Sequence, residues 1–473
     1  MSVQVATCTV DQLFSKHLSA NALHESTSIV CSEGRSIAGM LAIPEYQRPY
    51  CWQSQQLKSL LEDIKSHRLL NSEQPYYLGS LILHQEETLS NGISRLNIID
   101  GQQRVTTLSL MSFLLKPSLG ASNGLSFDNP ISQQQIKDNF KWLQQHLEEI
   151  KVCIDLEKLQ FTLVVTQSED DAYRFFETQN TGGVRLGGPD IIKAHHLRAV
   201  DKTFQTTFAQ KWEGLGELDD TISALLKGRF WQQMNARELP SYQQTKLVKD
   251  TIVKELAQDT GASKEDISYG RIRRVQGLSG EISQQISQQG YDVRQPLNAG
   301  INSIHYLSYF QELSHRYWKK PDLPHLAGYQ EFIAWLRRLE GCGYLEGLYQ
   351  ACLLLYISRF GEDQLEVAAK KLFRVVYSRR VSNQKAVREN SISSFVKETP
   401  VLDWIALSYT PEQCCKLLDR FELRVDPSNI KGNSVKKRFM DKVNKEFGLS
   451  LSDEQYEKEF AAAFTRKVTG SSL

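Results

Sequence analysis

The spacing of apolar residues divides the chain into a mixed N-terminal part and a helical C-terminal part. Before residue 200, segments typical of strands alternate with segments whose apolar residues recur every three or four positions. After residue 200 the strand signals fade and the helical period dominates. We therefore expect an α+β protein with an N-terminal domain at 1–200, whose core is 35–200, and a helical domain at 201–473 that can divide into two subdomains.

Short apolar runs predict three strands in the N-terminal part. These runs are Tyr77–Leu83, Leu96–Ile99 and Phe161–Thr166. Asn91-Gly92 lies between the first two runs and favours a hairpin turn. The expected helices of this part are Val10–Leu18, Leu57–Ile64, a helix after Asp100, Asp170–Thr178 and Pro189–Ala199.

Six later segments show the helical period. They are Leu247–Leu256, Ile301–Trp318, Tyr329–Leu339, Leu345–Phe360, Leu365–Val376 and Gln413–Phe421. Between the first two lies a polar stretch, Gly277–Gln295, which contains Ser-Gln-Gln repeats. This composition predicts a flexible connection or an exposed loop.

Composition excludes a few classes of protein. Lys and Arg number 56 and Asp and Glu number 55, so a nucleic acid would have to be bound by a local patch. The chain has neither an apolar run of about 20 residues nor a basic and apolar secretory start, which predicts a cytoplasmic protein without membrane association. Its 8 cysteines are scattered without C-x-x-C pairs, which favours reduced thiols over a metal site.

The segment from Leu96 to Leu108 joins a strand, a polar turn and the start of a helix. The free N–H groups and the dipole of a helix start favour a phosphate, and Gly101 lets the backbone approach a ligand. Arg104 can then donate to phosphate oxygens. The alternative interpretation is a capping box, with Asp100 as N-cap and Gln103 three positions later.

The segment Ile43–Trp52 carries Arg48 between two prolines and several aromatic residues. Prolines restrict the backbone, so this segment can hold Arg48 in a fixed direction towards a ligand. The alternative is an edge strand whose aromatic residues cover the core while Arg48 forms a surface ion pair.

A third segment, Phe175–Asp190, has four glycines within seven residues. Asn180, Thr181 and Gly183 could present N–H groups and a hydroxyl to phosphate, and Lys193 could add a charge from the next helix. A helix C-cap followed by a loop and a new helix explains the glycines equally well.

Local clusters of basic residues could contact a DNA backbone. The first cluster comprises Lys370, Lys371, Arg374, Arg379 and Arg380, followed by Lys385 and Arg388. Two further clusters are Arg271, Arg273 and Arg274, and Lys431, Lys436, Lys437 and Arg438. The alternative for each cluster is a solvated helix face.

Together the three segments resemble the N-terminal domain of GmrSD-type restriction proteins, within the ParB/sulfiredoxin-like superfamily. The resemblance rests on Ile-Pro-x-Tyr-Gln-Arg-x-Tyr-x-Trp, Asp-Gly-Gln-Gln-Arg-x-Thr-Thr-Leu and Phe-x-x-x-Asn-x-x-Gly-x-x-Leu, in this order, and covers about residues 35 to 200. It implies a nucleotide-binding module of bacterial defence against phage or modified DNA. Members of this family hydrolyse nucleoside triphosphates and govern a DNA-cleaving activity.

The family's motifs map onto individual positions of this chain. Arg48 matches the first motif, Asp100 to Arg104 match the second, and Asn180 and Gly183 match the third. Gly182 stands where the family commonly has Arg, so a third cationic contact is either absent or supplied by Arg185 or Lys193. The chain shows neither a P-loop nor the His and Asn set of an HNH nuclease.

We therefore expect the sensor or regulatory NTPase of an antiphage system that acts with a separate effector or nuclease subunit and contacts DNA. The expected catalytic residues are Asp100, Gln102, Gln103 and Arg104, and the expected nucleotide contacts are Arg48, Gly101, Thr106, Thr107, Asn180, Thr181, Gly183 and Lys193. The expected cofactors are a nucleoside triphosphate and Mg²⁺. Two alternatives stay open: a DNA nickase that uses the same site, and a non-catalytic DNA-binding adaptor. Either form could oligomerise.

Overall fold

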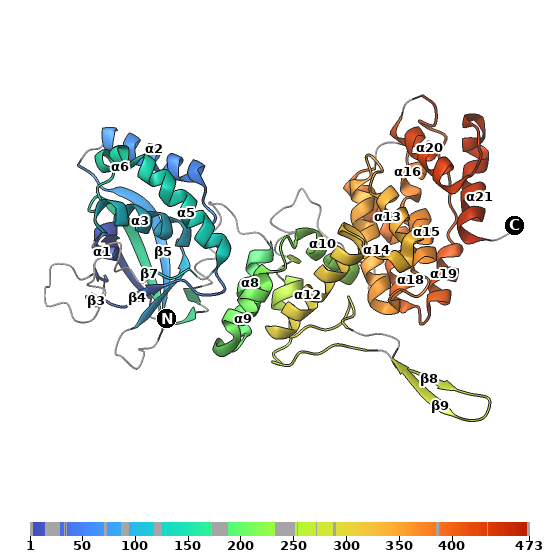
Figure 1. Cartoon of the computed structure of the whole chain (residues 1–473), viewed down its shortest axis with the longest axis horizontal. Helices are drawn as coiled ribbons and strands as arrows, with labels where there is room; N and C mark the ends of the chain where they lie inside the picture. The colour runs from blue at the N-terminus through green and yellow to red at the C-terminus, as the bar shows by residue number, and fades with distance from the viewer. Residues whose placement is uncertain are drawn as a thin grey trace. The chain divides into compact units, whose positions relative to one another are not determined.

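The chain folds into two compact units, Met1–Leu186 and Gly187–Leu473. The computed structural model describes residues 3–14, 29–32, 34, 36–70, 73–86, 94–117, 125–127, 129–169, 171–172, 188–231, 251–252, 254–270, 272–286, 290–384, 387–432 and 434–470. Figure 1 shows a sheet with helices in the first unit and mostly helices in the second. The expected α+β class is confirmed.

A five-stranded mixed sheet forms the centre of the first unit, in the order β1-β7-β5-β6-β4. The strands are β1 (Val3–Thr9), β4 (Met40–Ala42), β5 (Tyr76–Gln85), β6 (Arg95–Asp100) and β7 (Leu159–Thr166). β5 runs parallel to β7 and antiparallel to β6. The start of β5 and the end of β6 therefore lie at the same end of the sheet. A separate antiparallel pair consists of β2 (Ile29–Val30) and β3 (Ser36–Ile37).

Helices cover one face of this sheet. They are α1 (Val10–Phe14), α2 (Ser54–Leu70), α3 (Gln102–Leu115), α5 (Pro130–Gln145) and α6 (Leu147–Cys153), of which α2, α3, α5 and α6 lie together on one side in Figure 1. Alternate strand residues such as Leu81 and Leu83 join Leu57, Val105 and Leu108 of the helices in one buried core. This core fixes the position of α3 against the sheet.

The three predicted strands are confirmed as β5, β6 and β7, whereas the sequence did not predict β1. β1 is an edge strand whose Val5 is exposed, so it lacks the buried apolar run that marks the central strands. Asn91-Gly92 and most of Asp170–Thr178 lie outside the described residues. The helix expected at Pro189–Ala199 is α8 (Gly188–Ala199), which belongs to the second unit.

The second unit is built mainly from helices packed around α14. Its α-helices are α8, α9 (Lys202–Glu213), α10 (Asp219–Phe230), α12 (Ile301–Ser314), α13 (Ala327–Leu336), α14 (Gly343–Phe360), α15 (Leu365–Val376), α16 (Ser378–Ser382), α17 (Glu389–Glu398), α18 (Val401–Leu407), α19 (Pro411–Asp419), α20 (Val435–Phe447) and α21 (Tyr456–Thr469). Short π and 3₁₀ turns are η3 (Lys254–Gln258), η4 (His315–Lys319), η5 (Pro324–Leu326) and η6 (Asp453–Gln455). Although α14 is buried along most of its length, none of the described helices has the length and apolar character needed to span a bilayer.

The flexible connection or exposed loop expected at Gly277–Gln295 includes a strand that the sequence did not predict. β8 (Ile272–Gln276) and β9 (Ile282–Ile286) form an antiparallel ribbon that projects from the helices of the second unit in Figure 1. β9 could not be predicted from its Ser-Gln-Gln composition. None of its described side chains is buried, so the strand has no apolar pattern. The segment after the ribbon is anchored, since Asp292 and Gln295 are buried.

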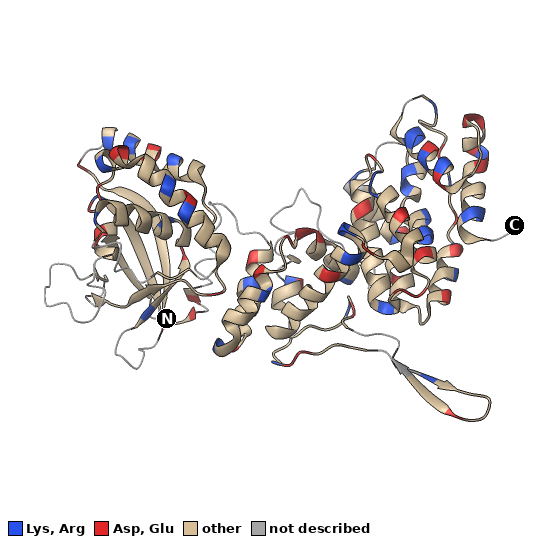
Figure 2. Ribbon diagram, viewed as in Figure 1, with Lys and Arg blue, Asp and Glu red and all other residues tan. Residues whose placement is uncertain are grey.

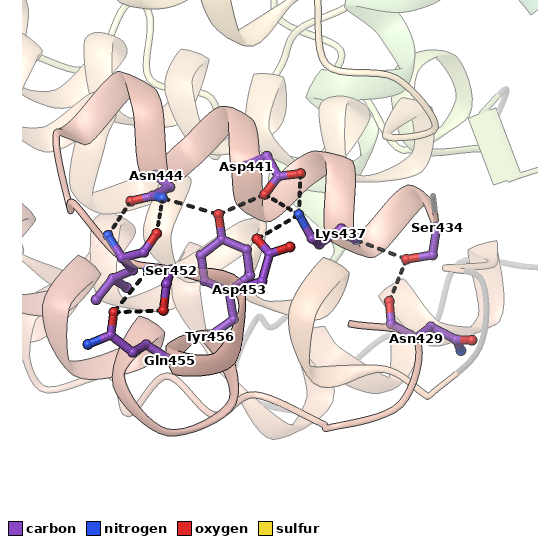
Figure 3. A network of polar contacts seen from close by, with 10 residues as sticks. Asn429, Ser434, Lys437, Asp441, Asn444, Ser452, Asp453, Gln455 and Tyr456 are labelled. Atoms are coloured by element: carbon purple, nitrogen blue, oxygen red, sulfur yellow. Dashed lines mark hydrogen bonds and ion pairs between the residues drawn. The ribbon is translucent and has the colours of Figure 1, made fainter. Parts of the chain in front are cut away.

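Polar contacts join the last two helices, as Figure 3 shows. Lys437 on α20 forms ion pairs with Asp441 at 2.8 Å and with Asp453 at 2.9 Å. Tyr456, the first residue of α21, donates to the same Asp441 at 2.7 Å. Asn444 holds the intervening loop through its contacts with the backbone of Leu451. The helix pair is thereby fixed by side chains in addition to its apolar contacts.

A buried histidine links α8 to η3 and to the start of α12. The Nε2–H of His196 donates to the carbonyl of Leu256 at 2.6 Å, and its Nδ1 accepts from the N–H of Gly300 at 3.3 Å. These contacts require the neutral ring, and burial lowers the pKa of His196 from 6.5 to about 3. Protonation in the folded state is therefore opposed.

We predict that this histidine weakens the protein in acid. Below pH 6.5 the unfolded chain takes up a proton that folded His196 refuses, so the free energy of unfolding should fall by about 2 kcal/mol between pH 7 and pH 5 from this residue alone. The test is chemical denaturation of the second unit as a function of pH. His196→Gln should flatten the slope, whereas His315→Gln, at an exposed position, should keep it. An unchanged slope in His196→Gln would contradict the assignment.

Candidate functional site

The side-chain amide of Gln103 joins α3 to the proline-containing segment before α2. Its Oε1 accepts from the backbone N–H groups of Cys51 at 2.9 Å and Trp52 at 3.2 Å. Its Nε2 donates to the carbonyl of Pro49 at 3.1 Å. The Gln103 side chain is buried, so these bonds are protected from water. This amide therefore positions the backbone of residues 49–52 on the first turn of α3.

Two further contacts fix the same segment. The Nε2 of Gln47 donates to the carbonyl of Ile99 at 2.9 Å, next to the end of β6. Tyr50 is fully buried, and its hydroxyl lies 2.7 Å from the hydroxyl of Thr107 and accepts from Asn139 at 2.9 Å. Burial raises the pKa of Tyr50, and the two hydrogen bonds only partly offset this effect. Thr107, expected as a nucleotide contact, is occupied by this internal bond.

Arg48 lies between the fixed positions Gln47 and Pro49. Its side chain is half-buried, and no described residue forms a hydrogen bond or ion pair with it. The surface ion pair that was one interpretation of this residue is thus not found among the described residues. A positive charge without a counter-charge among the described residues is suited to attract an anion.

The first turn of α3 is not capped by a side chain. The N-cap is Gly101, in the left-handed conformation with φ 98°, and it has no side-chain cap hydrogen bond. The interpretation as a capping box is therefore wrong, because Gln103 bonds to residues 49–52 instead. A Cβ at Gly101 would lie 2.7 Å from Cδ1 of Leu81, so both backbone conformation and space require glycine here. The N–H groups of this turn retain the capacity to bind an anion.

Arg104 holds the start of β5 next to this turn. Its Nη1 donates to the carbonyl of Leu78 at 2.6 Å, and its Nη2 donates to that of Ser80 at 2.9 Å. Gly79 lies between them and has φ 97°. A Cβ at this position would collide with Nη1 of Arg104, so the two hydrogen bonds of Arg104 require a glycine here. Asp100 lies 3.5 Å from Nη2 of the same arginine. The guanidinium of Arg104 therefore binds the backbone of β5 at Leu78 and Ser80 and orients the carboxylate of Asp100.

Two expected site residues carry buried polar atoms that have no hydrogen-bond partner among the described residues. Gln102 is only 6% exposed, and its Oε1 has no hydrogen-bond partner. The hydroxyl of Thr106, one turn further along α3, is likewise buried and unpaired. Buried polar atoms of this kind are costly unless a water or a ligand satisfies them. Gln102 directly follows Gly101, so its Oε1 lies at the uncapped start of α3.

Two family models match the chain. Residues 28–197 match the N-terminal domain of the GmrSD restriction endonuclease. This part of the chain is therefore similar to that domain, and we call residues 28–197 the GmrSD-like region. The resemblance noted from the sequence is therefore confirmed, and the domain indicates a component of a restriction system. Residues 204–434 match a family of unknown function, DUF7834, and no curated protein matches the chain.

The GmrSD-like region brings the first two motifs together, whereas the third motif lies outside the described residues. Gln47, Pro49 and the residues after it contact the end of β6 and the start of α3, so Arg48 and Asp100–Arg104 belong to one region. Asn180, Thr181 and Gly183 lie outside the described residues. Lys193 is buried in the second unit, where its Nζ forms an ion pair with Glu213.

The structure corrects the prediction of a DNA-binding cluster near residue 370. Lys371, Arg374 and Arg380 are buried, so they cannot reach a phosphate backbone. Lys371 pairs with Asp419 at 2.6 Å, and Arg380 donates to the carbonyl of Gly341. Lys370 and Arg379 are half-buried: Lys370 pairs with Glu366 at 2.6 Å and Arg379 lies 3.8 Å from Glu398. Arg388 is exposed, and Lys385 lies outside the described residues.

Arg374 shows why these cations lie inside. It is fully buried and donates to the carbonyls of Leu418 at 2.6 Å and Phe421 at 2.9 Å. It also reaches the hydroxyl of Thr465 on α21 at 3.2 Å. The guanidinium thus satisfies the carbonyls at the C-terminal end of α19 and joins α15 to two other helices.

Sequence reasoning missed the residues that hold the site in place. Gln47 lies inside the first motif, and its place in this motif was the available signal. Asn139 and Ser132 on α5 bond to Tyr50 and to its backbone N–H, but nothing in the sequence of α5 marks them. Among the described residues, no group of three His, Cys, Asp or Glu side chains could hold a metal ion.

We predict that Gln103→Leu releases the segment with Arg48. Three hydrogen bonds are lost while the polar backbone groups stay buried, so the free energy of unfolding should fall by about 2 kcal/mol. Amide hydrogen exchange at Cys51 and Trp52 should accelerate. Gln134→Leu on α5 is the matched control, because Gln134 is exposed and bonds only to Asp138. Unchanged exchange at both amides would refute the positioning role.

We predict that Arg374→Met strongly destabilises the second unit. The carbonyls at the end of α19 lose their donors in a buried place, which should cost on the order of 3 kcal/mol in denaturant unfolding. Lys370→Met on the same helix should cost about 0.5 kcal/mol or less, since its ion pair is half-exposed. Similar losses in both variants would show that Arg374 is not a structural residue.

Proposed function

We propose that the GmrSD-like region binds the phosphates of a nucleoside triphosphate between Arg48 and the start of α3. The observation that carries this proposal is an arginine whose two neighbours are held by hydrogen bonds and which pairs with no described residue, close to a helix start without a side-chain cap. Backbone N–H groups would bind the phosphate oxygens, and the guanidinium of Arg48 would balance their charge.

Hydrolysis is proposed to depend on Asp100 and Gln102. The Oε1 of Gln102, which has no hydrogen-bond partner among the described residues, would accept a hydrogen bond from the attacking water and orient it, as glutamine does in other phosphoryl transfers. Water would form a bond to the terminal phosphorus, the bond to the leaving diphosphate would break, and the proton would pass to the products. Arg104 and Gln103 are then positioning residues, because their donors are engaged by Leu78, Ser80 and Pro49.

A magnesium ion would need ligands from the nucleotide in addition to those from the protein. Asp100 is the carboxylate nearest the start of α3 in sequence, and Mg²⁺ commonly binds one carboxylate together with substrate phosphates and water. We therefore propose that Mg²⁺ arrives with the nucleotide. It would neutralise phosphate charge, while Arg104 keeps Asp100 oriented at 3.5 Å.

In this proposal the whole protein is the sensor or regulatory NTPase of a restriction system, and a separate effector cleaves the DNA. The family match supports the restriction context. Nucleotide binding would shift the protein between two states that the effector distinguishes.

The test is nucleotide affinity and turnover of the full chain in the presence of Mg²⁺. Arg48→Ala should weaken triphosphate binding about tenfold or more, because a charged hydrogen bond to phosphate is lost. Arg95→Ala is the control, since Arg95 is exposed at the other end of β6. Asp100→Asn should retain binding and lose turnover. Equal affinity in wild type and Arg48→Ala would reject the site, and binding without turnover in wild type would favour the adaptor.

A further inference from the structure

The ribbon of β8 and β9 is a projecting arm with a fixed base. Its strands pair in register from Ile272↔Ile286 to Gln276↔Ile282, and Gly277 and Gly280 form the turn. Figure 1 shows the ribbon extending away from the helices of its unit.

Hydrogen bonds to Asp266 fix the chain that enters the ribbon. Its carboxylate accepts from Tyr291 at 2.9 Å, from Asn302 at 2.9 Å and from His305 at 2.6 Å. Burial of Asp266 opposes its charge, but these three hydrogen bonds outweigh burial and lower its pKa. Tyr291 follows the ribbon, so this carboxylate joins its two ends.

Buried arginines fix the chain that leaves the ribbon. Arg229 donates to the carbonyls of Val293 and Gln295, both at 2.8 Å. Arg359 forms a buried ion pair with Asp292 at 3.0 Å. These contacts fix Asp292, Val293 and Gln295 on the C-terminal side of the ribbon.

The described side chains of the ribbon suit a polyanion. Arg274, Gln276, Ile282 and Gln284 are exposed and alternate onto one face, where Arg274 pairs with Gln284 across the strands. Arg274 forms no ion pair with any described residue. The sequence of β8 also contains Arg273, and the single acidic residue of 272–286 is Glu281 at the turn. Figure 2 marks basic positions on β8 and the acidic one near the turn.

We propose that this ribbon is a DNA-binding arm that inserts into a groove of duplex DNA. A two-stranded ribbon fits the major groove, arginine binds phosphates or guanine, and glutamine can bond to adenine edges. The buried cluster near residue 370 leaves the ribbon as a better placed cationic surface. This proposal goes beyond the nucleotide site and does not depend on it.

The test is binding of the full chain to a labelled mixed-sequence DNA duplex without nucleotide, over a range of salt concentrations. Arg274→Ala should weaken binding about tenfold near ~0.1 M salt and reduce the slope of log affinity against log salt by about 0.9. Arg273→Ala/Arg274→Ala should weaken it further, and Arg274→Lys should keep most of the slope. Because Arg274 is exposed, thermal unfolding should be unchanged.

Arg420→Ala is the charge-matched control, since Arg420 is an exposed cation in the same unit. Its affinity and salt slope should equal those of the wild type. Equal slopes in wild type and Arg274→Ala would overturn the proposal, as would equal losses in Arg274→Ala and Arg420→Ala. Absence of duplex binding by the wild type would overturn it too, and would leave the nucleotide site to be judged by its own turnover assay.

Discussion

The amide of Gln103 is the constraint on which the geometry of the N-terminal domain depends. Its three hydrogen bonds hold residues 49–52 against the start of α3, and the bond from Gln47 to Ile99 holds the other side of Arg48. Because Gln103 is engaged in this way, it cannot close a capping box with Asp100. The same residue therefore brings an arginine close to the helix start and leaves that start uncapped.

Much of this domain could be predicted from the sequence, because its strands and glycines have local causes. The buried runs of β5, β6 and β7 and the requirement for glycine at position 101 are visible in the pattern of residues. The partner of Gln103 could not be predicted, since a buried glutamine bonds equally well to its own helix or to a distant backbone. The hydrogen bonds of Arg104 to β5 depend on the irregular strand pairing around Gly79, which can be seen only in the structure.

In the second unit, the helices could be predicted from apolar periodicity, but the roles of the charges could not. A run of basic residues looks the same in sequence whether it faces water or the ends of other helices. Arg374 is buried because the carbonyls at the end of α19 need donors, and these residues lie more than forty positions apart. Arg274, in contrast, lies on a ribbon whose base is fixed by Asp266. Arg374 is thus placed by the backbone carbonyls that need a donor, and not by the number of charges near it in the sequence.

The central claim is that the segment with Arg48 and the start of α3 together bind a triphosphate. Cys51 offers the most direct measurement, because it is the exposed one of the eight cysteines and its N–H bonds to Gln103. The rate at which a small alkylating reagent modifies Cys51 should be measured by mass spectrometry with increasing triphosphate and Mg²⁺. The account predicts that the nucleotide slows this modification in a saturable way, and that Arg48→Ala shifts the protection to higher concentrations. A rate that is the same at every nucleotide concentration would contradict it.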